Sequence, residues 1–198
     1  MDDSSDSGVA CSAWDHSGCE GTPYCPPRCP RFVDKYGAAL IVRPLEPADR
    51  DQLVAMYLDF PHEHRSMGLP PANRKQVERW VDRLVERGRN FVAVDDAVVG
   101  HAVYSPTTAD VPEFAVFVHP DSHDLGIGSE LTRHAIAYAA SEGHEALCLD
   151  VQRDNHRAIH VYRRLGFEEV ESPGVDVTMR LSLSHPTAAQ VQLAPGLT

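Results

Sequence analysis

Two glycines, Gly126 and Gly128, stand directly before a segment whose apolar residues recur at helical spacing. The first N–H groups of a helix have no acceptor within the helix, and the helix dipole makes this end positive. A phosphate binds there if the backbone can approach it, which glycine permits because it lacks a Cβ and tolerates positive φ. The stretch HDLGIGS, residues 123–129, is therefore a candidate pyrophosphate cradle, although this pattern also occurs in simple turns.

Two well-known phosphate loops do not fit this stretch. A dinucleotide-binding loop needs glycine at position 131, which is Leu131, and it would come earlier in the chain. A Walker loop needs G-K-[ST], which does not follow. Both observations argue against a Rossmann or a P-loop site.

A second motif follows at residues 150–167, DVQRDNHRAIHVYRRLGF, which has the form N-x-x-A-x-x-x-Y-x-x-x-G-F from Asn155 to Phe167. Together with H-D-L-G-I-G at 123–128, it resembles the two signature motifs of the GNAT superfamily of acyl-CoA-dependent N-acetyltransferases. The resemblance covers residues 39 to 182. His123 replaces the Gln or Arg usual in that family, and Asp124 replaces a glycine or a basic residue. We therefore expect the Asp124 charge to weaken acetyl-CoA binding, and added salt to restore it.

The resemblance implies an α/β fold with a mixed, mostly antiparallel central sheet, flanked by helices and splayed between its fourth and fifth strands. The strand at 116–118 would hold the pantetheine arm of acetyl-CoA, and a backbone N–H near Val118 would polarise the thioester carbonyl. The loop would hold the pyrophosphate, and the next helix would contact the cofactor from the other side. The cofactor-binding residues implied in this way are Val116, Phe117, Val118, His123, Asp124, Leu125, Gly126, Ile127, Gly128, Ser129, Asn155, Ala158 and Tyr162.

Tyr162 matches the general acid of the family. A phenol with a pKa near 10 can protonate a departing thiolate if it is held beside the sulfur. Tyr162 also continues an apolar helical stripe with Ala158, Val161 and Leu165, so a role in the core is the alternative.

The general base has two candidates. A lysine amine has a pKa of about 10.4, so its proton must be removed before it attacks. Glu113 begins the strand that leads to the loop, where many relatives carry a catalytic glutamate. Asp150 ends the ALCLD strand, where some ribosomal-protein N-terminal acetyltransferases carry theirs. We favour Glu113; a solvated carboxylate at a strand end, with water as the base, is the alternative.

Residues 1–36 form a cysteine-rich N-terminal arm with almost no periodic apolar pattern. Four thiolates suit a structural zinc ion, which would also staple a segment that has no core of its own. The usual C-x-x-C pairs are missing, so free thiols on a loose arm or disulfides are alternatives, and His16 can replace one ligand. The candidate zinc ligands are Cys11, Cys19, Cys25 and Cys29.

The elements that must position these residues follow from hydrophobic periodicity. The pattern predicts the order β-α-α-β-β-β-α-β-α-β-β over residues 37–183, which is an α/β sandwich with a mixed sheet. Residues 184–198 are polar and contain prolines, which predicts a flexible tail. The predicted strands cover 39–45, 90–94, 98–104, 113–120, 146–151, 166–171 and 175–183.

Composition narrows the class of protein. The net charge of −11, from 29 acidic and 18 basic residues, argues against nucleic-acid binding. No apolar run approaches the roughly 18 residues of a membrane span, and the polar start MDDSSDSG is unlike a signal peptide, which predicts a cytoplasmic protein.

The acceptor is less well defined by the sequence. Residues 60–70, FPHEHRSMGLP, fall in the acceptor region of the family, and with EFAVFV they are similar to prokaryotic protein-lysine acetyltransferases. An acidic surface also suits a cationic acceptor, either a small amine or a protein lysine. A non-catalytic module that senses acyl-CoA, or an interaction protein, is the alternative, and a homodimer is compatible with the sequence.

Overall fold

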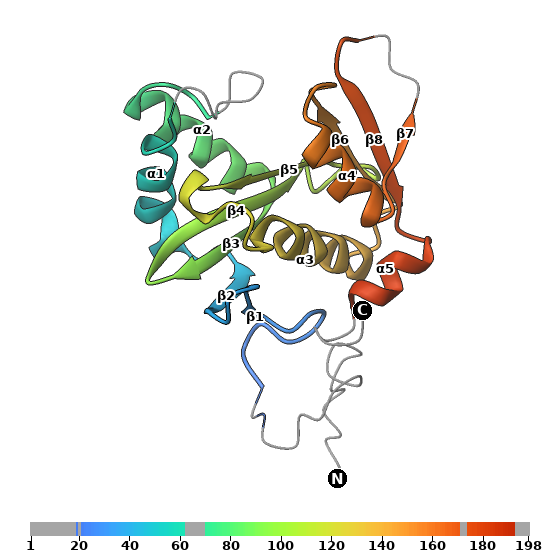
Figure 1. The fold of residues 1–198 in the computed structure, drawn as a ribbon, viewed down its shortest axis with the longest axis horizontal. Coiled ribbons are helices and arrows are strands. Elements are labelled where there is room, and N and C mark those ends of the chain that lie inside the picture. The colour runs from blue at the N-terminus through green and yellow to red at the C-terminus, as the bar shows by residue number, and fades with distance from the viewer. Residues whose placement is uncertain (1–18, 20, 62–69, 171–173, 193–198) are drawn as a thin grey trace.

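The structure is a computed structural model that describes residues 19, 21–61, 70–170 and 174–192 (Figure 1). Its centre is a sheet of eight strands in the order β1-β2-β3-β4-β5-β6-β8-β7. All neighbouring strands run antiparallel except β5 and β6, which are parallel. The strands are β1 Arg31–Val33, β2 Ala39–Pro44, β3 Arg89–Asp95, β4 Ala97–Ser105, β5 Glu113–Val118, β6 Ala146–Val151, β7 Glu168–Val170 and β8 Val177–Ser182.

Within the described residues, five α-helices surround this sheet: α1 Arg50–Leu58, α2 Arg74–Arg87, α3 Ile127–Ser141, α4 His156–Arg164 and α5 Pro186–Val191. Helices α1 and α2 pack on one face and build one hydrophobic core, which includes Tyr57 and Trp80. Helix α3 crosses the other face, where Leu131 and Ala135 belong to a second core (Figure 1). The predicted α/β architecture is confirmed.

Capping residues mark the starts of helices α2 and α3. The Asn73 side chain accepts a hydrogen bond from the Gln76 N–H at the start of α2, and Gly88 follows its end. At the other predicted helix start, Gly126 precedes α3 with φ of +89°, which an L-residue adopts only with strain. These positions were predictable because capping is a local property of the sequence.

The predicted splay lies between β5 and β6. β5 pairs with β4 along its whole length, from Glu113 opposite Ser105 to Val118 opposite Gly100. By contrast, a single register pair, Glu113 with Cys148, joins the fully described strands β5 and β6. The two strands therefore meet at the start of β5 and diverge toward Val118, which opens the sheet on the side of the glycine loop.

Both ends of the chain differ from the sequence-based boundaries. Within the predicted arm, Arg31–Val33 pairs with β2 as an edge strand, and Cys29 is buried. Within the predicted flexible tail, Pro186 begins α5, whose Ala188 and Val191 are buried in the core that contains α3. Short segments such as these carry too few apolar residues for periodicity to reveal them.

In the part of the chain that the structure describes, no helix is both long and apolar enough to cross a membrane.

Candidate active site

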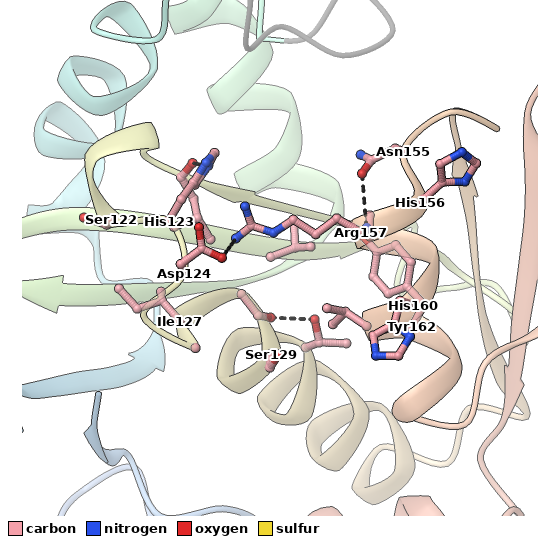
Figure 2. Close-up of a pocket in the computed structure, with 17 residues that line it drawn as sticks. Ser122, His123, Asp124, Ile127, Ser129, Asn155, His156, Arg157, His160 and Tyr162 are labelled. Carbon is pink, nitrogen blue, oxygen red and sulfur yellow. Dashed lines mark hydrogen bonds and ion pairs between the residues drawn. The ribbon is translucent and has the colours of Figure 1, made fainter. Parts of the chain in front are cut away.

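A cleft of about 900 Å³ opens where β5 and β6 diverge (Figure 2). One wall is the end of β5 with the loop into α3, and the other wall is the start of α4. Eleven of the residues predicted to bind the cofactor line it: Val116, Val118, His123, Asp124, Gly126, Ile127, Gly128, Ser129, Asn155, Ala158 and Tyr162. The strand-loop-helix motif and the N-x-x-A-x-x-x-Y motif thus face each other across one cavity.

Phe117 and Leu125 do not line the cleft. Phe117 alternates to the other face of the sheet, where its ring meets the rings of Tyr57 and Trp80 edge-on, each at 5.5 Å between centroids. Leu125 packs against the core beneath α3. The side chains of these two residues therefore point away from the cleft, while their backbone groups, which the resemblance assigns to cofactor binding, belong to the same strand and loop.

The loop presents backbone rather than side chains to the cleft. Gly126 stands at the helix N-cap, and the N–H groups of the first turn, from Ile127 to Ser129, have no acceptor within α3. A Cβ on Gly128 would lie 3.4 Å from Val118 Cγ2, so a side chain there would narrow the space between the loop and β5. This arrangement is suited to an anion that must come close to the backbone.

His123 ties the loop to the strand before it. Its Nε2 lies 3.0 Å from the carbonyl oxygen of Val118, so Nε2 carries the hydrogen and donates it. The side chain that departs from the Gln or Arg of the motif therefore fixes the end of β5, while it also lines the cleft.

Asp124 does not present an unpaired negative charge to the cleft. Its backbone is left-handed, with φ of +62°, and its Oδ1 lies 2.7 Å from Nη2 of Arg157 on α4. Figure 2 shows this ion pair bridging the two walls. The sequence-based expectation treated Asp124 as an isolated charge, because the pairing residue lies far along the chain.

The position of Tyr162 is compatible with both roles that the sequence left open. It lines the cleft from α4, and it also packs against the core with its ring 5.7 Å from that of Phe167. Burial raises the pKa of the Tyr162 phenol to about 12. The phenol therefore keeps its proton at neutral pH, as a general acid must. Asn155 holds the start of the same helix by accepting a hydrogen bond from the Ala158 N–H at 3.1 Å.

The two candidate bases lie outside the cleft lining. Glu113 is the exposed first residue of β5, opposite Cys148. Asp150 is exposed on β6 and accepts a hydrogen bond from Thr178 Oγ1 at 2.6 Å. Five residues of extended strand place Glu113 about 16 Å from Val118. A base at Glu113 therefore cannot take a proton directly from an amine beside Val118, and it would act through water.

The family model described as "Acetyltransferase (GNAT) family" matches residues 51–167, which is more than half of the chain. The chain belongs to the GNAT family. A mycothiol acetyltransferase of Frankia casuarinae is 29% identical over 164 residues, covering 74% of this chain and 44% of that protein. A streptothricin acetyltransferase of Streptomyces lavendulae is 40% identical over 83 residues, covering 40% of this chain and 44% of that protein.

An uncharacterized N-acetyltransferase of Methanocaldococcus jannaschii is 46% identical over 81 residues, covering 41% of this chain and 34% of that protein. The chain therefore spans less than half of the length of each of these three curated relatives. Among solved structures, the GNAT domain of S. lividans PAT aligns with a TM-score of 0.66 and 22% identity, over 77% of this chain and 95% of that one. At this identity the structural likeness establishes the GNAT fold.

The structure adds lining residues of the GNAT cleft that the motifs do not mark. They are Ser122, Thr132, His156, Arg157, His160 and Val161. Helical spacing places His160 and Val161 near the line of Asn155, Ala158 and Tyr162, so a helical projection from the motif could have found them. Arg157 had no such signal, because its importance depends on the loop that it meets.

The candidate zinc ligands are only partly described. Cys19 and Cys25 are free thiols and Cys29 is buried, whereas Cys11 and His16 lie outside the described residues. Among the residues that are described, no three His, Cys, Asp or Glu side chains form a group that could hold a metal ion. Zinc binding by the GNAT chain therefore stays a prediction from the sequence, without support from the structure.

Proposed function

We propose that this GNAT chain transfers the acetyl group of acetyl-CoA to a primary amine by direct attack. The observation that carries the proposal is the pairing of two walls in one cleft. One wall offers helix N–H groups beside a left-handed glycine, and the other holds the protonated phenol of Tyr162. A nucleotide thioester needs both an anion site and a proton donor for the leaving sulfur.

Each wall has a defined part in this reaction. The pyrophosphate binds the first turn of α3, and the pantetheine arm runs along the backbone of β5 that β6 does not pair. The amine nitrogen attacks the thioester carbonyl carbon, and the carbon–sulfur bond then breaks. The thiolate takes a proton from Tyr162, the amine loses its proton to the base, and the products are an amide and CoA.

A protein lysine or an N-terminal amine is the acceptor class that we favour. The resemblance of the acceptor region to protein-lysine acetyltransferases supports this choice, although residues 62–69 lie outside the described residues. Neighbours in fold include a spermidine N-acetyltransferase chimera (TM-score 0.60, 19% identity, 73% of this chain and 96% of that one). The net charge of −11 would also attract a cationic acceptor to the protein.

Calorimetric titration with acetyl-CoA, followed by thiol release in the presence of amines, tests this function. The panel should contain lysine peptides, peptides with free N-termini, and polyamines. Binding with amine-dependent release of CoA would support the enzyme and identify its acceptor. Binding without release by any amine would indicate a module that only binds acyl-CoA, and the absence of binding would overturn the proposal.

Replacing Glu113 with Gln is expected to lower turnover by about tenfold or more, because a base lost from a water relay slows removal of the amine proton. It should also flatten the rise of the rate toward basic pH. The measurement is the pH–rate profile of the variant beside Asp150→Asn and beside Glu86→Gln, an exposed glutamate of α2. An unchanged profile for Glu113→Gln would assign the role to Asp150 or to water alone.

A further inference from the structure

The cleft offers its ligand a single permanent cation. Of the described residues that line it, Arg157 is the only lysine or arginine. The pyrophosphate of a nucleotide thioester is anionic, and the protein around it is strongly acidic. The helix N-terminus alone contributes only about half an elementary charge. The loop, moreover, carries Asp124 where the family has a glycine or a basic residue.

Arg157 places a positive charge close to the loop that precedes α3. Its guanidinium reaches from α4 across the cleft to Asp124, two residues before the N-cap glycine of α3 (Figure 2). The ion pair uses Nη2, and Arg157 makes no other side-chain hydrogen bond or ion pair with the described residues. An arginine fork has five N–H donors in a fixed plane, so the donors on Nε and Nη1 are left for a second anion.

Burial does not prevent this second contact. The side chain of Arg157 is 58% exposed and that of Asp124 is 66% exposed, so the ion pair lies at the open rim of the cleft. An exposed pair of this kind contributes little to stability, at most about 1 kcal/mol by general experience. Stability therefore does not account for this ion pair, whereas its position beside the candidate phosphate site suggests a role in binding.

We propose that Arg157 is the cation that binds the cofactor pyrophosphate, and that Asp124 positions its guanidinium over the first turn of α3. The proposal rests on the proposed use of acetyl-CoA. In this arrangement the positive charge missing from the loop is supplied by the opposite wall of the cleft. Asp124 acts through Arg157 and does not itself contact the phosphate, because two anions repel each other.

The test compares two thioesters that differ in their phosphates. Arg157→Gln should weaken acetyl-CoA binding about tenfold or more, since it removes charge-assisted hydrogen bonds to an anion. It should leave binding of S-acetylpantetheine, which has no pyrophosphate, unchanged. The loss should persist with acetyl-dephospho-CoA, which keeps the pyrophosphate but lacks the 3′-phosphate. Arg164→Gln is the matched control, because Arg164 is an exposed arginine of the same helix that does not line the cleft.

A variant that keeps the positive charge but changes its geometry shows whether the orientation of the guanidinium matters. Arg157→Lys keeps the charge but loses the planar fork, so it should recover only part of the affinity. Titrations at low and at high salt should show the deficit of Arg157→Gln shrinking as salt screens the rim of the cleft.

Three results would overturn the inference. Equal acetyl-CoA binding by the wild type and Arg157→Gln would show that Arg157 does not contact the phosphates. An equal loss for S-acetylpantetheine would show a general effect on the cleft. A deficit that disappears with acetyl-dephospho-CoA would move the contact away from the pyrophosphate. Failure of the wild type to bind acetyl-CoA is distinct from all three, because it overturns the proposed function and this inference with it.

Discussion

Replacing Tyr162 with Phe is expected to lower the turnover of acetyl transfer by about 100-fold or more, the usual effect of losing a positioned general acid. The variant keeps the ring that packs 5.7 Å from Phe167, so the core and the cleft wall should be preserved. Only the hydroxyl that protonates the leaving sulfur is removed. Acetyl-CoA affinity should therefore stay within about twofold, and the loss should appear in kcat rather than in KM.

The pKa of the Tyr162 phenol adds an expected pH dependence of kcat to this prediction. Because burial raises the pKa of Tyr162 to about 12, the proton stays on the acid throughout the accessible pH range. The wild type should show no fall in kcat from deprotonation of Tyr162 up to about pH 10, where an ordinary tyrosine would be half ionised. Any decline below that pH must then come from another group.

The measurement is a steady-state assay of CoA release for the wild type, Tyr162→Phe and Tyr36→Phe. Tyr36 is a suitable control because its side chain is exposed in the turn between β1 and β2 and lies away from the cleft. Unchanged kcat in Tyr162→Phe would show that Tyr162 belongs to the wall and core only. A parallel loss of acetyl-CoA affinity would show that the hydroxyl binds the cofactor rather than acting as the acid.

The sequence predicted the loop and the helix start that form this site, because these depend on residues that are close in the chain. It did not predict which charged side chains pair across the cleft. The left-handed position at Gly126 depends on neighbouring residues and was evident in the sequence. The partner of Asp124 lies 33 positions away, and no spacing rule connects Asp124 to Arg157. His101 illustrates the same limit. It is fully buried, bonded to Tyr57 and Asn90 from two other elements, and burial lowers its pKa to about 3.

An ion pair with a longer separation in the sequence joins the N-terminal arm to α3. Arg28 donates through Nε to Glu130 Oε1 at 2.6 Å and through Nη2 to Oε2 at 3.0 Å. A third hydrogen bond runs from Nη1 to the carbonyl of Val191 in α5. The side chains of both charged residues are almost completely buried. The bidentate ion pair thus holds the arm to α3, and the third hydrogen bond holds the arm to α5.

Replacing Arg28 with Met is expected to lower the free energy of unfolding by about 3–5 kcal/mol, because Glu130 would remain as a buried charge that has lost its bidentate partner. The double variant Arg28→Met with Glu130→Leu should recover most of the loss, since both charges are then removed. Urea unfolding of the two variants beside the wild type provides the measurement. Arg74→Met, which breaks an exposed pair with Glu78, should cost no more than about 0.5 kcal/mol.

The pH dependence of this effect has a definite sign. Burial by itself raises the pKa of Glu130, but the hydrogen bond from His134 and the charge of Arg28 together hold that pKa well below its usual range. A lowered folded pKa stabilises the protein above the unfolded value of about 4.3, and this contribution is lost as pH falls further. In Arg28→Met the carboxyl can take up a proton without losing a bidentate partner. The difference in stability between the two proteins should therefore narrow as the pH falls below about 4.3.

This pair also bears on the cofactor loop, because Glu130 lies one turn into α3 and its N–H bonds the carbonyl of Gly126 at 3.0 Å. Loosening the arm should shift the helix start that forms the phosphate cradle, so Arg28→Met should also weaken acetyl-CoA binding. A destabilisation below about 1 kcal/mol, comparable to that of an exposed pair, would show that water reaches Glu130 once the arm is released. Equal destabilisation of the single and double variants would instead show that Arg28 acts through packing and its bond to α5, not through the charge of Glu130.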